Sequence, residues 1–128
     1  MPAPKVYTKE NVDVEAEKSV KLVEIPYGSG DITLISFLAN SPKFKLYVKI
    51  DGKEEDLESP EFYNSLALEK GIVYKHYYSD AESKYGMTSE IEIHFDKSAE
   101  VWVVNKDTTK KTLIAGIVVI ENFCEGKE

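Results

Sequence analysis

The strongest structural signal in the chain is Phe44-Lys45-Leu46-Tyr47-Val48-Lys49-Ile50-Asp51-Gly52. Apolar residues at every second position alternate with Lys and Tyr, the period that places one set of side chains on one face of a β-strand. The Asp51-Gly52 pair favours a type I′ turn, because both central positions of that turn require a positive φ. We therefore expect a half-buried strand that folds back through residues 53–57 as a hairpin.

Further strands are expected on both sides of this hairpin. Before it, the residues Tyr27-Gly28-Ser29-Gly30 indicate a turn between two strands, because two glycines readily supply a positive φ. Apolar and polar residues alternate, or short apolar runs occur, at residues 19–25, 31–39, 72–78, 90–96, 100–105 and 112–121. Residues 79–88 are polar and are expected to form a loop.

One short helix is expected after the hairpin. Ser59 is suited to be its N-cap, Pro60 its first residue and Gly71 its stop. Seven or eight short strands with a single helix predict an all-β fold, an antiparallel β-sandwich of the jelly-roll kind. Residues 1–18 are interpreted as an N-terminal arm, residues 19–123 as the sandwich domain and residues 124–128 as a C-terminal tail.

The charge balance argues against a nucleic-acid partner. The 128 residues include 16 Lys and no Arg, and the net charge of −7 repels a phosphate backbone. Without Arg, the chain lacks the planar group that grips phosphate or guanine with two hydrogen bonds. Phosphoryl transfer and sequence-specific DNA reading are therefore disfavoured. The many Glu and Lys, with few Cys and Met, are also typical of proteins from thermophiles.

No targeting or membrane segment is expected. The residues that follow Met1 lack the apolar core of a signal peptide, and the longest apolar run, residues 113–120, is too short to span a bilayer. A cytoplasmic location is the default. Cys124 is the single cysteine, so no disulfide can form within the chain, and we interpret it as an incidental thiol.

We expect no catalytic residue, no metal and no cofactor, and therefore no enzyme. The two histidines, His76 and His94, fall on separate expected strands without the close spacing of a metal site. Ser29 lacks the Gly-x-Ser-x-Gly context of a hydrolase nucleophile. The acidic residues 54–58 could hold calcium, but their spacing fits no calcium loop, and a solvated strand face explains them better.

Several strands have apolar residues in both alternating sets, whereas a two-layer sandwich buries only one face of each sheet. We therefore expect a neighbouring subunit to cover the second face, in a homo-oligomer for which a trimer is favoured. The alternative is that the helix and the arm cover it. The interface candidates are Tyr74, Tyr77, Tyr78, Tyr85, Trp102, Val104, Ile114, Val118 and Ile120.

A second function class is a carbohydrate-binding or other ligand-binding module. Tyr and Trp combine a flat apolar ring with a polar group, which suits stacking against a sugar. The residues of such a platform would be Tyr77, Tyr78, Tyr85 and Trp102. The preference of Tyr for strands explains the cluster equally well. A hydrolase with an unrecognised pair of acids is the least supported class.

Three segments resemble small β-sandwich structural proteins of tailed phages and related viruses. A Gly-rich turn at residues 28–30 leads into a strand, Asn40-Ser41-Pro42-Lys43-Phe44 follows as a link, and an alternating strand ends in Asp51-Gly52. Residues 93–105 resemble the second half of these proteins. The resemblance implies a non-enzymatic virion component, such as a capsid decoration protein or a tail module, that contacts the other structural proteins of the assembly. It transfers no functional residue.

Overall fold

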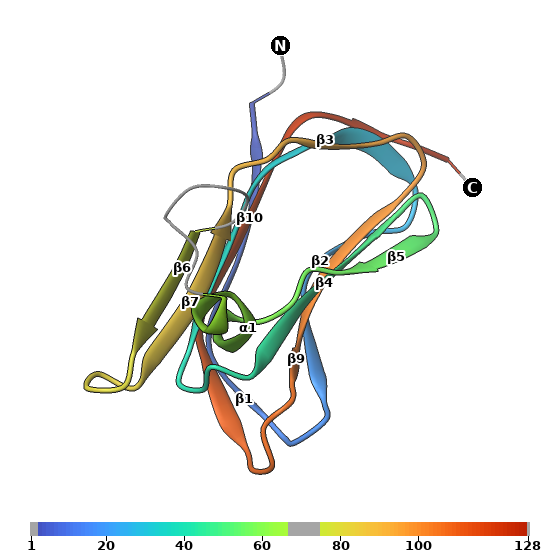
Figure 1. Ribbon diagram of the computed structural model, residues 1–128. Coiled ribbons are helices and arrows are strands. Elements are labelled where there is room, and N and C mark those ends of the chain that lie inside the picture. The colour runs from blue at the N-terminus through green and yellow to red at the C-terminus, as the bar shows by residue number, and fades with distance from the viewer. Residues whose placement is uncertain (1–2, 67–74, 128) are drawn as a thin grey trace.

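The computed structural model describes residues 3–66 and 75–127, which form two antiparallel β-sheets that face each other (Figure 1). The six-stranded sheet contains, in order, β1 (Lys5–Val14), β10 (Lys111–Glu125), β3 (Gly28–Ala39), β7 (Lys84–Ser89) and β6 (Lys75–Ser79), with β8 (Ile93–Phe95) also paired to β3. The four-stranded sheet contains β2 (Ser19–Ile25), β9 (Ala99–Asn105), β4 (Phe44–Ile50) and β5 (Lys53–Asp56). The predicted antiparallel β-sandwich is confirmed.

The central hairpin forms as predicted. β4 and β5 pair antiparallel, and Asp51 and Gly52 between them have φ values of 52° and 86°, as a type I′ turn requires. The Asp51 carboxylate also accepts hydrogen bonds from the backbone N–H groups of Asp96, Lys97 and Ser98, between β8 and β9. The hairpin turn is thereby tied to the neighbouring connection.

The predicted helix is α1 (Pro60–Ser65). The Ser59 side chain accepts a hydrogen bond from the Phe62 backbone N–H, which confirms Ser59 as the N-cap. α1 packs against β6 and β7. α1 ends at Ser65 with Leu66 as its C-cap, earlier than the expected stop, Gly71, which lies outside the described residues.

Two expected turns or loops are strands in the structure. Gly28 and Gly30 belong to β3, and neither has a positive φ. Glycine is needed at these positions for another reason, because neighbouring atoms leave little room for a side chain. A Cβ atom on Gly28 would lie 3.1 Å from the Cys124 carbonyl oxygen, and one on Gly30 would lie 3.0 Å from the Ile120 side chain. The expected loop at residues 79–88 contains most of β7, whose small and polar residues weaken the strand pattern.

The expected N-terminal arm and C-terminal tail also contain strand residues. β1 pairs with β10 from Lys5 to Val14, so most of the expected arm is an edge strand of the six-stranded sheet. β10 continues to Glu125, and the Gly126 backbone N–H donates to the Tyr27 carbonyl oxygen at 3.1 Å. Backbone pairing, which hydropathy does not reveal, extends the sandwich in both directions.

The core lies between the two sheets. It consists of alternate residues of the facing strands, including Phe44, Leu46 and Val48 of β4, Val101 and Val103 of β9, and Ile32, Ile35 and Phe37 of β3. Gly116 of β10 also faces inward, and a Cβ atom there would lie 2.7 Å from the Leu22 side chain of β2. The residues between these buried positions therefore lie on the two outer faces of the sandwich.

Candidate interaction surfaces

The outer face of the six-stranded sheet, turned away from the four-stranded sheet, has three rows of side chains in register. The Leu38 row crosses the strands as Glu10, Ala115, Leu38, Gly86 and Tyr77. The Ser36 row crosses them as Thr8, Ile117, Ser36, Thr88 and Lys75, and the shorter Leu34 row as Val6, Val119 and Leu34. These rows alternate with the buried positions of the same strands.

This outer face is open to solvent although most of it is uncharged. Val6 is 57% exposed, Tyr77 is 49% exposed, and Ala115 is also exposed. Ile117, Val119, Leu34 and Leu38 are partly exposed. Glu10 and Lys75, on opposite edges of the sheet, are the charged side chains of the three rows. Exposed apolar side chains gathered on one face in this way are typical of a contact surface.

The Leu38 row has a relief of one ridge between two hollows. Leu38 stands between Ala115 on β10 and Gly86 on β7, and the small size of these neighbours leaves a groove on each side. The groove at Ala115 has a volume of about 230 Å³, and the groove at Gly86, which Lys75 also lines, about 340 Å³. Gly86 is required by the fold, because a Cβ atom there would lie 2.4 Å from the Phe37 carbonyl oxygen.

The outer face of the four-stranded sheet is different in character. Trp102 and Tyr47 pair across β9 and β4, and their rings stack with centroids 5.5 Å apart and planes 9° apart. Ion pairs surround them: Lys21 binds Glu100 at 2.9 Å, and Lys45 binds Asp56 at 2.8 Å. Val104 lies beside Lys45 in the same sheet. Tyr47 was missed by the sequence analysis because it reads as one polar position of an alternating strand.

The four proposed aromatic platform residues do not come together. Tyr77 lies on the outer face of the six-stranded sheet, and Trp102 lies on the other sheet. Tyr78 and Tyr85 contact each other edge to face with ring centroids 4.8 Å apart, and Tyr85 is buried. Successive strand residues point to opposite faces, which separates Tyr77 from Tyr78. Tyr74 lies outside the described residues.

Tyr85 is held in place by its hydroxyl group. It donates a hydrogen bond to Asp80 at 2.5 Å, and this bond to a carboxylate raises the pKa of Tyr85 to about 12. The Tyr77 hydroxyl similarly donates to Glu82. Both tyrosines are therefore neutral hydrogen-bond donors that fasten the hairpin of β6 and β7.

Three interface candidates are corrected by their burial. Val118 and Ile120 are 0% exposed in the core of a single chain, and Tyr85 is 6% exposed. They cannot contact a second subunit without unfolding, and the outward-facing residues of β10 are Ala115, Ile117 and Val119 instead. Ile114 lies at a register shift between β10 and β3 and is partly buried. The apolar run of β10 therefore has two faces, as expected, and the set that is open to solvent is Ala115, Ile117 and Val119.

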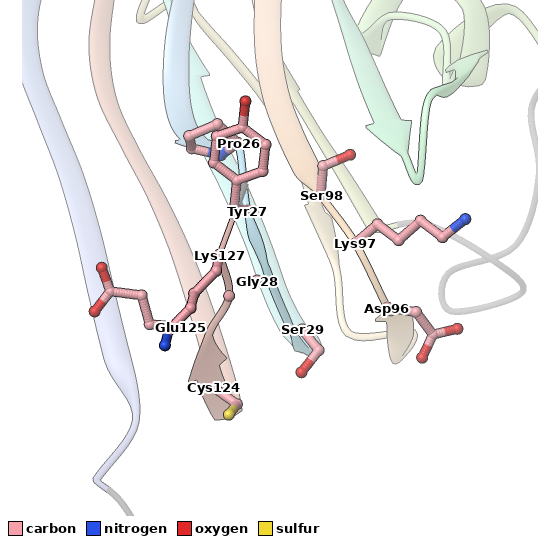
Figure 2. Close-up of a pocket in the computed structure, with 11 residues that line it drawn as sticks. Pro26, Tyr27, Gly28, Ser29, Asp96, Lys97, Ser98, Cys124, Glu125 and Lys127 are labelled. Atoms are coloured by element: carbon pink, nitrogen blue, oxygen red, sulfur yellow. The ribbon is translucent and has the colours of Figure 1, made fainter.

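A groove of about 450 Å³ lies where the C-terminal end of the described chain passes the connection between β8 and β9 (Figure 2). Tyr27 and Gly28 lie on one side of it and Lys97 and Ser98 on another. Cys124 also lines the groove and is exposed. Figure 2 shows the charged ends of Lys97 and Glu125 pointing to opposite sides, so the lining side chains do not converge on a common point.

His94 is bound by two carboxylates near this groove. Its Nδ1 lies 2.7 Å from Asp31 and its Nε2 lies 2.8 Å from Asp96, and the Asn122 side chain donates to the other Asp31 oxygen at 2.9 Å. Only the imidazolium can donate from both nitrogens at once. The hydrogen bond to Asp31, followed by that to Asp96, raises the pKa of His94 above its usual value of 6.5. Asp31 and His94 lie 63 residues apart in the chain, so nothing in the sequence indicated that they come together.

The described side chains form no metal centre. Within residues 3–66 and 75–127, no group of three or more His, Cys, Asp or Glu side chains is arranged to hold a metal ion. Asp31 and Asp96 bind opposite ring nitrogens of His94, so these three side chains do not point to one ion. In the acidic run, Asp56 and Glu58 instead bind Lys45.

In the same part of the chain, no helix has the length and apolar character that crossing a bilayer requires.

The comparisons with known proteins do not assign the chain to a family. No protein-family model matches it, and no curated protein matches its sequence significantly.

Proposed function

We propose that the chain is a non-enzymatic structural protein that works by assembly, with the outer face of the six-stranded sheet as its main contact surface and a homo-oligomer as its form. The observation that supports this most is the open, nearly uncharged face formed by the Leu38, Ser36 and Leu34 rows. In a chain with 30% charged residues, a face with one Glu and one Lys at opposite edges is unusual. Burial of apolar surface is the main driving force of association.

The resemblance to small phage and viral β-sandwich proteins extends this proposal to a virion component, either a capsid decoration protein or a tail module. Its support is the β4 to β5 hairpin closed by Asp51 and Gly52. Such a component acts through surface complementarity and needs no reactive side chain. The chain would then contact other structural proteins of the same particle.

The test is the solution mass of the full chain, measured by light scattering over a hundredfold range of protein concentration. We expect a mass that is a fixed multiple of the 14.5 kDa chain and does not change with concentration over most of the range. The mass of one chain at every concentration would overturn the proposed homo-oligomer.

A second candidate function is binding of a carbohydrate by the four-stranded sheet. The parallel stack of Tyr47 and Trp102 is the observation that favours it, because flat aromatic surfaces bind the apolar faces of sugars. A glycan array tests this candidate, with Trp102→Ala as the variant and Tyr77→Ala, on the other sheet, as the control. Glycan signals that the Trp102 variant loses and the Tyr77 variant keeps would support it. The absence of any signal for the unaltered chain would refute it.

A further inference from the structure

We infer that the occupant of the outer face of the six-stranded sheet is a second copy of this chain, packed face to face about a twofold axis that runs between β10 and β3. This inference rests on the proposed function and names its geometry. A twofold contact is isologous: if a residue of one copy touches a given position of the other, the reverse contact is also made. The face must therefore be complementary to itself.

The relief of the Leu38 row meets this condition. Leu38 on β3 and Ala115 on β10 are direct neighbours in the sheet, one a ridge and the other the floor of a groove. An axis between these two strands places Leu38 of each copy over Ala115 of the other. Two ridges thus fill two hollows, which is the close packing that sheet faces need.

The charges at the two edges also agree with this axis. It places β1 of one copy over β7 of the other, so that Glu10 enters the groove at Gly86, which is lined on its far side by Lys75. Each dimer would gain two such pairs of opposite charge. In the single chain Lys75 pairs with Glu90 at 3.4 Å, and because both side chains are mostly exposed, Lys75 can exchange this contact for one with Glu10.

The overall charge explains why this face, and not another, suits self-association. Two copies with a net charge of −7 each repel one another, most strongly where acidic groups meet. The three rows have no net charge, and their centre contains Ile117, Val119 and Leu34. A closed twofold pair buries these residues in both copies. We infer a dimer in place of the trimer expected from the sequence, because a twofold contact uses one patch on both copies, whereas a trimer requires two different contact patches.

The first experiment compares the solution mass of the full chain with that of Ala115→Glu. Ala115 is exposed, so the new carboxylate leaves the fold of the single chain intact, which circular dichroism and thermal melting check. In the dimer it would lie unpaired under Leu38, and we expect the dissociation constant to rise by about a hundredfold. Ser19→Glu is the matched control: Ser19 is also a small exposed residue, it lies at the start of β2 in the other sheet, and the change should leave the dissociation constant unchanged.

The second experiment tests the axis by exchange of charges. Glu10→Lys places two cations together and should weaken the dimer by about threefold to tenfold, as exposed rim charges do. Adding Lys75→Glu to the same chain should restore the wild-type dissociation constant. A double variant as weak as Glu10→Lys would overturn the proposed axis.

The outcomes separate this inference from the proposed function. A wild-type chain with twice the mass of one chain, an Ala115→Glu variant with the mass of one chain, and an unchanged Ser19→Glu variant would support the inference. A wild-type oligomer that Ala115→Glu does not weaken would overturn the inference and leave the proposed assembly function standing. A wild-type chain that is a monomer at all concentrations would overturn both.

Discussion

Asn105 at the end of β9 is the buried polar residue on which the lower end of the sandwich in Figure 1 depends. Its side chain is 0% exposed, and its Nδ2 donates to the carbonyl oxygens of Val14 at 2.8 Å and Thr109 at 3.0 Å. Its Oδ1 accepts from the Asp107 backbone N–H at 2.8 Å. One amide group therefore connects the end of β1 with the turn between β9 and β10.

We expect Asn105→Leu to lower the free energy of unfolding by about 3 kcal/mol, roughly 1 kcal/mol for each of the three lost hydrogen bonds. Leu has the same branched shape and the same number of side-chain heavy atoms as Asn and is somewhat larger, so no cavity forms and the loss comes from backbone groups left without partners. The melting temperature should fall by about 10 °C for a chain of this length.

Urea unfolding followed by the fluorescence of Trp102, the only tryptophan, measures this loss. The matched control is Asn64→Ala on α1, where the exposed Asn side chain can be removed with a change within about 0.5 kcal/mol. An Asn105→Leu variant as stable as this control would refute the argument, because it would show that water or rearrangement satisfies the three backbone groups at no cost.

Three further predictions concern the turn, the histidine cluster and a glycine. Desolvation raises the pKa of Asp51, but hydrogen bonds from three backbone N–H groups outweigh it and hold the pKa below 3.8. Asp51→Ala should therefore lower the free energy of unfolding by about 1 kcal/mol at pH 7. In urea titrations, the difference in stability between this variant and the wild type should fade as the pH falls through the lowered pKa. NMR titration should place the pKa of His94 above 6.5 in the wild type and closer to 6.5 in Asp31→Asn. The stability that protonated His94 contributes is complete below pH 6.5 and is lost as the pH rises through the raised pKa. A wild-type pKa at or below 6.5 would contradict the two hydrogen bonds. Gly86→Ala should destabilise the chain by about 2 kcal/mol or more, measured by thermal melting, because the new Cβ would lie 2.4 Å from the Phe37 carbonyl oxygen, which is fixed in the backbone. An unchanged melting temperature would show that β3 and β7 can separate at this position.

Local chemistry accounts for much of the fold that could be predicted. The alternation in β4, the type I′ turn at Asp51 and Gly52, and the Ser59 cap of α1 all depend on residues next to one another in the chain. The glycines at positions 28 and 30 were misjudged for a physical reason: glycine is used both for positive φ and for close packing, and only the neighbouring strand shows which.

The sequence by itself determined the class of the fold, the absence of Arg chemistry and the presence of two apolar faces on β10. It could not determine which apolar set is buried, because alternation defines two sets without saying which faces the other sheet. Strand pairing made this choice, with Val118 and Ile120 turned inward and Ile117 and Val119 outward.

Contacts between residues far apart in the chain were decided only by the tertiary structure. The ridge of Leu38 beside Ala115, the stack of Tyr47 on Trp102 and the pairing of Asp31 with His94 each join strands that are distant in sequence. Such contacts follow from the order and register of strands, which are properties of the whole sheet and not of any local segment.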